Sequence, residues 1–267
     1  MGRPFAKYEG LGNDFVVLGA ADEREISGEL AQALCDRRRG IGADGVLLVL
    51  PPRDRSCVAR MKVINADGSV PEMCGNGLRC VALHIARARR MKEGALLFDT
   101  DAGPRACTID DVDARGVVTV DMGIVRADGK RELDVGGERL EAWLADAGNP
   151  HAVVFGEATR ARAEAIGPSI EKHPSFPRGT NVEAAHVDAA AASIDLVVWE
   201  RGVGITLACG TGACATVAVA CARGLVPYGR QTTVNLPGGA LEITIADGGR
   251  CTMRGPARHV FAGQLPV

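Results

Sequence analysis

Aromatic residues are scarce in this 267-residue chain, because Phe, Trp and Tyr together make up only 4% of it. So few rings argue against a surface that stacks nucleic-acid bases. An excess of charge of one sign is also missing, since 31 Lys and Arg residues stand against 33 Asp and Glu residues, a formal net charge of −2. This balance excludes a strongly basic nucleic-acid surface as the main feature of the protein.

Spacings typical of metal and nucleotide sites are missing too. None of the nine cysteines forms a CxxC pair, and Cys74 and Cys80, or Cys209 and Cys214, do not have standard zinc spacing. We therefore expect no metal site. The run "GIGADG" at 40–45 matches G-x-G-x-x-G, but the strand-like "VLLVL" follows it. A dinucleotide site needs a helix at that point, so we do not expect one.

Long hydrophobic runs are few. The N-terminal "MGRPFAKYEG" has no apolar core of the kind found in signal peptides. Residues 202–222 carry no charge, but four glycines crowd the first half, and only 213–222 is typical of a continuous helix. This pattern favours a buried core helix over a membrane span. With an odd number of cysteines and no leader, the simplest expectation is free thiols in a reducing cytoplasm.

What the sequence does contain is an internal repeat. Hydrophobic residues make up 46% of the chain, enough for a real core in one large domain or two smaller ones. The motif Cys-Gly-Asn-Gly at 74–77 returns as Cys-Gly-Thr-Gly at 209–212, 135 positions later. Further pairs keep an offset of 132 to 136: Gly12-Asn13 with Gly148-Asn149, "MKVIN" with "LVVWE", Gly103 with Gly238, and Ser27 with Thr159. Such a series predicts two similar α/β halves.

Each half has the same expected order of elements. Ser27 and Thr159 are suitable N-caps for helices over 27–39, stopped by Gly40, and over 159–172. A buried helix follows each cysteine turn, and Gly224 suits the end of the second one. Cys80, Cys214 and Cys221 lie on these helices and are expected to be packing residues. The β-branched runs predict strands over 45–50, 59–64, 116–122, 193–200 and 241–246.

Cys74 and Cys209 each stand at the expected start of a helix. The partial positive charge at a helix N-terminus lowers the pKa of a thiol and supports a reactive thiolate. The glycines after each cysteine expose backbone N–H groups that can hold a carboxylate. If the repeat places the two turns opposite each other, one thiol can remove a proton from a carbon while the other returns one. This arrangement predicts inversion of a stereocentre and does not require a Schiff-base cofactor.

Other uses of the cysteines are open at this stage. Both could be small residues at tight turns, although two at matching positions favour function. A Cys-His hydrolase or acyl transferase would need one cysteine and one histidine. A thiol sensor would need a resolving cysteine. The candidate bases for a hydrolase are His84, His151, His173, His186 and His259.

Longer motifs around these residues resemble the diaminopimelate epimerase family of PLP-independent amino-acid racemases, over nearly the whole chain. The resemblance implies a mixed α/β (α+β) fold of two pseudo-symmetric domains, each a mostly antiparallel or mixed sheet around a central buried helix, with the active site in the cleft. We expect the domains to be 1–121 and 122–267, with the last strand, about 259–267, returning to the first. The motifs are "GLGNDF" at 10–15, "GIGADG" at 40–45, "NADGSVPEMCGNGLRC" at 65–80, "AGNPHAV" at 147–153, "GTNVE" at 179–183 and "ERGVGITLACGTGACA" at 200–215.

The resemblance also implies roles for particular residues. Cys74 and Cys209 correspond to the acid-base pair, and His151 and Glu200 to polar partners near the reacting centre. The carboxylate cradle would be the amides of Gly75, Asn76, Gly210 and Thr211. The groups that hold the distal end of the substrate would be Asn13, Asn65, Asn149, Asn181 and Arg201. An arginine can bind a carboxylate through two hydrogen bonds, which suits a diamino diacid.

The expected activity is interconversion of LL- and meso-diaminopimelate for lysine and peptidoglycan synthesis. The alternative is a related racemase for another amino acid. The resemblance implies a homodimer, a small-molecule substrate, no cofactor, and neither nucleic acid nor membrane as partner. The sequence departs from the family pattern at Gly45, where Gln is frequent, at Ile205, where Glu is usual, and after Glu183, where an aromatic residue is expected. These positions bear on substrate preference.

Overall fold

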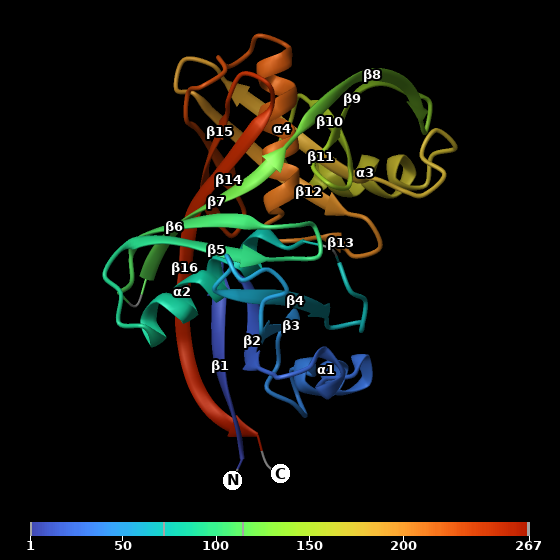
Figure 1. The fold of residues 1–267 in the computed structure, drawn as a ribbon. Coiled ribbons are helices and arrows are strands. Elements are labelled where there is room, and N and C mark those ends of the chain that lie inside the picture. Colours follow the sequence, from blue (N-terminus) through green and yellow to red (C-terminus); the bar gives the residue numbers. More distant parts are fainter. Residues whose placement is uncertain (1, 72, 114, 266–267) are drawn as a thin grey trace. The chain divides into compact units, whose positions relative to one another are not determined.

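The computed structural model describes residues 2–71, 73–113 and 115–265. In these residues, four α-helices stand among sixteen strands, so the fold is mixed α/β with mostly sheet (Figure 1). The residues pack into two compact units. The first unit contains the residues up to Asp121 and those from Arg254 onward, and the second contains Met122–Met253.

The first unit has helices α1 and α2 and a one-turn 3-10 helix, Glu23–Glu25. The α-helices are α1 (Gly28–Cys35) and α2 (Gly75–Ala88). The strands are β1 (Arg3–Gly10), β2 (Asn13–Gly19), β3 (Gly45–Leu50), β4 (Ala59–Asn65), β5 (Gly94–Asp99), β6 (Arg105–Asp111), β7 (Arg115–Ile124) and β16 (Arg250–Leu265), of which β7 and β16 continue into the second unit.

The strands of the first unit form a closed ring. Their order is β1-β2-β3-β4-β5-β6-β7-β16, and β16 also pairs antiparallel with β1, from Arg3 opposite Leu265 to Glu9 opposite Arg258. Helix α2 contacts β1, β2, β3, β4 and β6, and its first turns are buried. A sheet thus surrounds one central helix.

The second unit repeats this plan. Its helices are α3 (Arg160–Glu171) and α4 (Gly210–Ala222). Its strands are β8 (Arg126–Val135), β9 (Glu138–Asp146), β10 (Pro150–Phe155), β11 (Asn181–Asp188), β12 (Ser193–Glu200), β13 (Gly204–Ile205), β14 (Thr232–Leu236) and β15 (Gly239–Ile245). The order is β16-β15-β14-β12-β11-β10-β9-β8, with β13 on β12. Helix α4 contacts β8, β9, β10, β11, β12 and β15, so it is the central helix here.

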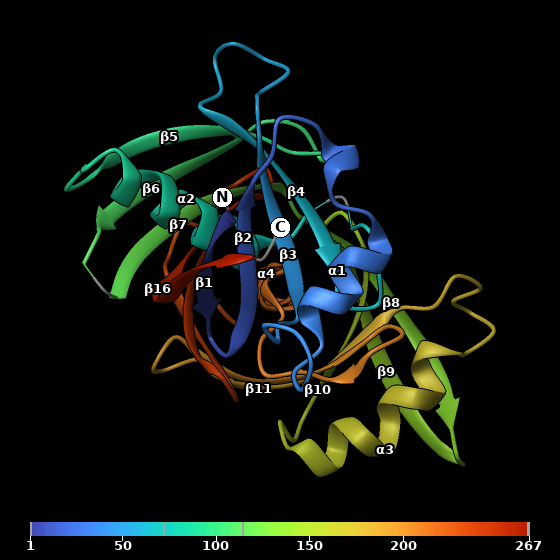
Figure 2. The ribbon, with the colours of Figure 1, turned by 90° about the horizontal axis from the view of Figure 1, so that it is seen from below.

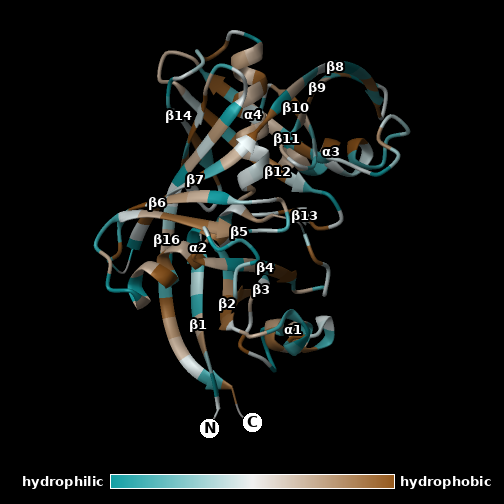
Figure 3. Cartoon of the chain, viewed as in Figure 1, coloured by the Kyte–Doolittle hydropathy of each residue, from teal (hydrophilic) through white to brown (hydrophobic). Residues whose placement is uncertain are grey.

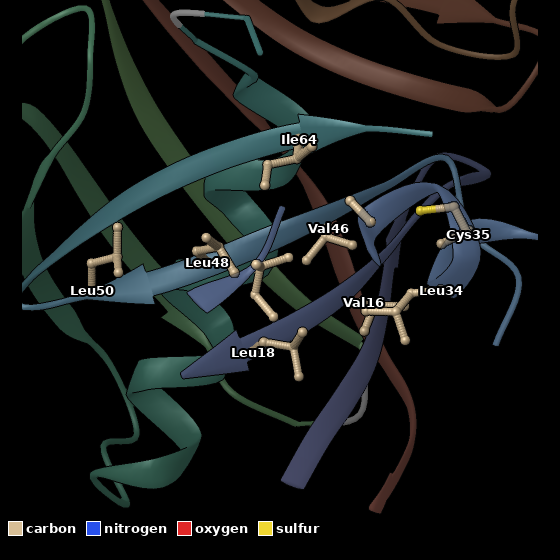
Figure 4. Packing of buried hydrophobic residues seen from close by; sticks show 11 residues of the cluster. Val16, Leu18, Leu34, Cys35, Val46, Leu48, Leu50 and Ile64 are labelled. Atoms are coloured by element: carbon tan, nitrogen blue, oxygen red, sulfur yellow. The ribbon is translucent and has the colours of Figure 1, made fainter. Parts of the chain in front are cut away.

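Strands β2 and β3 are buried on both faces, which explains why they are almost uniformly apolar. Side chains alternate along a strand. One set of β2, β3 and β4 side chains packs under α1, which carries both polar and apolar residues (Figures 2 and 3). Figure 4 shows this cluster, whose labelled members are Val16, Leu18, Leu34, Cys35, Val46, Leu48, Leu50 and Ile64. The other set, which includes Leu47, faces α2.

The second unit has the matching layer. Ala152 of β10 and Val182 of β11 pack against Ile166 and Ile170 of α3. The alternate side chains, including that of Glu183, face α4. The predicted fold class, two similar α/β halves each built around a buried helix, is confirmed.

The ends of the helices are governed by local hydrogen bonds. Ser27 and Thr159 cap α1 and α3 as predicted, by accepting from Leu30 N and Arg162 N. Helix α1 stops at Cys35, earlier than the predicted stop at Gly40.

The reason for the early stop is Asp36. Its Oδ1 accepts the backbone N–H groups of Arg38 and Arg39, a local turn that competes with the helix. Gly224 follows α4 with φ of 70°, a left-handed conformation that favours glycine, and the predicted helix end is confirmed there. Among the helices of the described residues, none combines the length and the apolar composition of a membrane span.

Candidate active site

The two turn cysteines have the same local geometry. Cys74 is the N-cap of α2 and Cys209 is the N-cap of α4, both with extended backbone. Each Sγ atom accepts the backbone N–H three residues later, from Gly77 and from Gly212, at 3.4 Å in both cases. The prediction that each cysteine stands at a helix start is confirmed.

Gly77 and Gly212 are required by close packing. A Cβ atom at Gly77 would lie 2.8 Å from Cδ2 of Leu47 and 3.5 Å from Sγ of Cys74. A Cβ atom at Gly212 would lie 2.9 Å from Oε1 of Glu183 and 3.3 Å from Sγ of Cys209. The glycines therefore let a strand and a thiol approach the first turn of the helix together.

Four residues of the predicted cradle begin the helices. Gly75 and Asn76 are the first residues of α2, and Gly210 and Thr211 are the first of α4. Backbone N–H groups at these positions take no part in the helix ladder and point toward its N-terminal end. Both turns therefore have the anion-binding geometry of a helix N-terminus.

In the first unit the structure brings Asn13 and Asn76 together. Nδ2 of Asn76 donates to Oδ1 of Asn13 at 3.3 Å, and Nδ2 of Asn13 donates to Oδ2 of Asp44 at 2.9 Å. Asn65 ends β4, where Nδ2 donates to Oγ of Ser69 at 2.9 Å. These contacts hold the side-chain amides of all three residues in a defined orientation.

An ionic cluster stands behind Asn13. The carboxylate of Asp14 lies 2.7 Å from Nζ of Lys7 and 2.7 Å from Nη2 of Arg37, which also reaches Asp44. Burial raises the pKa of Asp14, but hydrogen bonds from Arg37 and Lys7 outweigh it and lower the pKa to about 2. Asp14 is therefore ionised at neutral pH and anchors the start of β2.

The second unit holds a buried polar chain. Oε1 of Glu183 lies 2.7 Å from Nδ1 of His151, and both side chains are fully buried. Nε2 of His151 lies 2.8 Å from Oδ1 of Asn149. Neither ring nitrogen is thus placed to accept the proton of Cys209, which argues against a Cys-His hydrolase.

Asn181 and Arg201 are linked through the backbone. Nδ2 of Asn181 donates to the carbonyl of Pro150 at 3.0 Å, and its Oδ1 accepts the N–H of Arg201 at 2.9 Å. The exposed guanidinium of Arg201 donates to the carbonyl of Arg178. Asn181 therefore links β10 to the backbone that follows β12, which fixes the position of the Arg201 main chain.

Cys209 departs from one prediction. Burial raises the pKa of its thiol well above the ordinary value, and the charges of Glu200 and Glu183 raise it further. Hydrogen bonds with Thr211 and Gly212 oppose this shift but do not reverse it. The lowered pKa expected from the helix N-terminus is wrong for Cys209, because a buried thiolate beside two carboxylates is unfavourable.

Glu200 lies next to this thiol. Burial raises the pKa of its carboxyl, while hydrogen bonds with Thr206 and Cys209 lower it. The Thr206 hydroxyl donates to Oε1 of Glu200 at 2.6 Å. The structure thus brings Glu200, Thr211 and Cys209 together.

The other four histidines lie elsewhere. His84 and His259 pack edge-on against the ring of Tyr8 in the first unit. His173 contacts Phe176, and His186 lies 3.3 Å from the carbonyl of Gly156.

The predicted packing residues and the positions that depart from the family pattern are also placed. Cys80, Cys214 and Cys221 are buried in the helices, as expected, and all nine cysteines are free thiols. A Cβ atom at Gly45 would lie only 2.9 Å from the carbonyl oxygen of Ile64, so this backbone leaves little room for a longer residue. Ile205 packs on a small apolar cluster that includes Ala163.

Three groups at the site were not predicted from the sequence: Glu183, Thr206 and Asp44. A signal existed for Glu183, since a carboxylate inside the apolar run "NVEAA" of β11 must face a polar partner.

A cavity of about 280 Å³ on β9, β10 and α3 contains none of the predicted site residues. Across residues 2–71, 73–113 and 115–265, no group of three or more His, Cys, Asp or Glu side chains is arranged to hold a metal ion.

A family pattern and individual protein sequences that match this chain all point to one family. The pattern of the family described as diaminopimelate epimerase matches residues 5–127 and 143–260. The chain is 43% identical to a diaminopimelate epimerase of Microcystis aeruginosa over 99% of both chains. It is 44% identical to one of Desulfitobacterium hafniense, over 97% of this chain and 96% of that protein.

Solved structures show the same fold at low identity. A probable proline racemase from Agrobacterium radiobacter is 17% identical with a TM-score of 0.77, over 99% of this chain and 93% of that one. A predicted epimerase from Pseudomonas aeruginosa is 14% identical with a TM-score of 0.74, over 99% of both chains.

Proposed function

Because this chain belongs to the diaminopimelate epimerase family, we propose that it is an isomerase that interconverts LL- and meso-diaminopimelate through the thiols of Cys74 and Cys209. The observation that carries the mechanism is the repeated N-cap. Each unit places one cysteine at the first turn of its central helix, with the same 3.4 Å contact from the third N–H. Two equivalent acid-base groups are what inversion of a carbon requires.

The proposed proton transfer balances within the protein and substrate. A thiolate removes the α-hydrogen as a proton and becomes a thiol, and the electron pair of the C–H bond passes into the adjacent carboxylate system. The second cysteine, as a thiol, gives its proton to the opposite face of the carbon and becomes a thiolate. The raised pKa of Cys209 favours its thiol form in the free enzyme. No cofactor takes part in this proposal.

The helix N-termini would stabilise the carbanion. As charge moves from carbon onto the carboxylate oxygens, an enediolate-like species forms. Backbone N–H groups of Gly75, Asn76, Gly210 and Thr211 would donate to these oxygens where the charge develops. Glu200 would stand at the reacting centre beside Cys209.

The distal end of the substrate would be held by groups that can match an ammonium and a carboxylate. Amide oxygens accept from an ammonium, and amide N–H groups and a guanidinium donate to a carboxylate. The residues proposed for this are Asn13, Asn65, Asn149, Asn181 and Arg201.

The pathway, the oligomeric state and the cellular compartment are also part of the proposal. The reaction would serve lysine and peptidoglycan synthesis, and a homodimer follows from the family resemblance. Nine free thiols suit a reducing cytoplasm. The proposed catalytic halves are 1–121 and 122–267, with the last strand, about 259–267, returning to the first; residues 266 and 267 lie outside the described residues.

An isomer assay tests the proposal. LL- and meso-diaminopimelate are offered beside L-histidine and L-proline, and the stereochemistry of each product is measured by chiral chromatography. We expect turnover of diaminopimelate in both directions. Turnover of histidine or proline alone would replace the proposal with a related racemase for another amino acid.

A further inference from the structure

Equivalent strand positions in the two units have different side chains next to the two cysteine turns. In the first unit, parallel strands β2 and β3 pair Phe15 with Gly45. In the second unit, parallel strands β10 and β11 pair His151 with Asn181. His151 is 136 positions after Phe15, and Asn181 is 136 positions after Gly45. His151 therefore occupies the strand position that Phe15 has in the first unit.

The same register relates Leu47 to Glu183, two residues further along β3 and β11. Both side chains point at the first turn of the central helix, Leu47 at Gly77 and Glu183 at Gly212. Leu47 and Phe15 therefore make an apolar support below one thiol turn. A carboxyl and an imidazole occupy the equivalent places below the other.

Burying an ionised carboxylate is costly unless another group neutralises it. Glu183 is fully buried, and its pKa is raised by burial while His151 lowers it. Glu200 lies close enough for the charge of Glu183 to raise the pKa of the Glu200 carboxyl. His151 is therefore the group that must balance Glu183.

The contacts of His151 indicate how many protons the His151–Glu183 pair carries. Oε1 of Glu183 and Nδ1 of His151 are 2.7 Å apart, so one proton lies between them. In the structure Oδ1 of Asn149 faces Nε2 at 2.8 Å, and an oxygen can only accept, so this orientation of the amide assigns a second proton to Nε2. With two protons the pair has no net charge, whether the first is nearer nitrogen or oxygen. With one proton it would have a buried net charge of −1.

We infer that Glu183 is a positioning residue: it forms a net-neutral, two-proton pair with His151, whose Nε2–H fixes the orientation of the Asn149 amide. With Oδ1 of Asn149 turned to the ring, Nδ2 is turned away from it and remains a donor. That orientation suits a carboxylate ligand. The substrate side of the inference rests on the proposed function, which assigns Asn149 to the distal end of the diacid; the proton count does not.

Nitrogen NMR of the substrate-free protein tests the proton count. The histidines are labelled with ¹⁵N, and the His151→Gln variant assigns the His151 signals. At pH 8 we expect a proton on Nε2 and a second proton in the hydrogen bond between Nδ1 and Oε1 of Glu183. A bare Nε2, with the only proton on Nδ1, would overturn the inference. This result does not depend on any substrate.

Steady-state kinetics test whether Glu183 affects substrate binding through the amide of Asn149. Glu183→Leu should fit, because Leu47 occupies the equivalent place against Gly77. It leaves Nδ1 without a partner, so we expect the KM for diaminopimelate to rise about tenfold with a smaller change in kcat, the size of one lost hydrogen bond. Glu183→Gln can donate an N–H to Nδ1 as a protonated carboxyl does, so its KM should lie closer to wild type.

A double-mutant cycle separates positioning from a general structural effect. In an Asn149→Ala background, Glu183→Leu should raise KM by less than about threefold, because the amide through which it acts is gone. If Glu183→Leu raises KM as much in that background as in the wild type, Glu183 does not act through Asn149 and the inference is wrong. If Glu183→Leu does not fold, the same cycle is run with Glu183→Met, which is closer to glutamate in shape and also lacks a donor to Nδ1, and the NMR result stands independently.

Discussion

Gly212 lies so close to Glu183 that a Cβ atom at position 212 would be 2.9 Å from Oε1 of the carboxyl. The same atom would lie 3.3 Å from Sγ of Cys209. One missing side chain thus lets a helix, a thiol and a buried carboxyl share a small space. The contact links the central helix of the second unit to the chemistry at its N-terminus.

Gly212→Ala should therefore damage activity more than stability. Overpacking of this kind costs about 1–3 kcal/mol, while displacement of the thiol should lower kcat/KM for diaminopimelate about 10²-fold. Gly19→Ala is the control, because nothing lies within 4 Å of a Cβ there. Thermal unfolding and steady-state rates measure both effects. Near-wild-type kcat/KM in Gly212→Ala would contradict the close fit.

Both turn thiols should be essential. Cys74→Ala and Cys209→Ala should each lower the epimerisation rate by about 10²–10⁴-fold or more, since each removes a general acid-base group. Cys80→Ala is the matched control on the same helix as Cys74, because Cys80 is a buried packing residue. If either turn cysteine can be removed with little loss of rate, the two-base mechanism is wrong.

Solvent hydrogen should enter the substrate. In D₂O, the thiol that protonates the carbon carries deuterium, because thiol protons exchange with water. Mass spectrometry of the product should show one deuterium per inverted centre. Product that contains only the original hydrogen would exclude proton exchange with solvent as proposed.

The first unit should lose stability as the pH falls from 7 to 5. Burial lowers the pKa of both His84 and His259, and the charge of Arg87 lowers them further; His84 is also affected by His259. The unfolded chain thus takes up protons at a higher pH than the folded chain does. This contribution to stability is full above the ordinary histidine pKa of about 6.5 and is lost as the pH falls toward the lowered folded values.

Melting temperatures across this range measure the effect, and the variant His84→Gln/His259→Gln should have a flatter pH profile. Asp14, with a pKa of about 2, stays ionised throughout and does not contribute. An unchanged slope in the double variant would assign the pH dependence to other groups.

Much of the fold could be predicted from the sequence, because repeated local patterns have local causes. The Cys-Gly-x-Gly turns, the caps at Ser27 and Thr159 and the strand over 45–50 depend on neighbouring residues. The early end of α1 depends on one side chain, Asp36, which prefers to bond its own following N–H groups.

The electrostatic state of the site could not be predicted in this way. The pKa of Cys209 depends on Glu200 and Glu183, which come from β12 and β11 and meet the thiol only in the folded unit. A helix N-terminus by itself would lower that pKa. Burial and two carboxylates act against it, and their combined effect requires three-dimensional contacts.

The last strand has a consequence for dividing the chain. Residues Arg250–Met253 of β16 belong to the second unit, and the strand then continues into the first, where it pairs with β1 and closes the ring. A polypeptide that ends at Asp121 would leave the outer edges of β1 and β7 open, and open edges invite pairing between chains. The two halves of this repeat are therefore similar in plan but cannot be separated by a single cut, because the first unit is completed by residues that follow the whole second unit in the sequence.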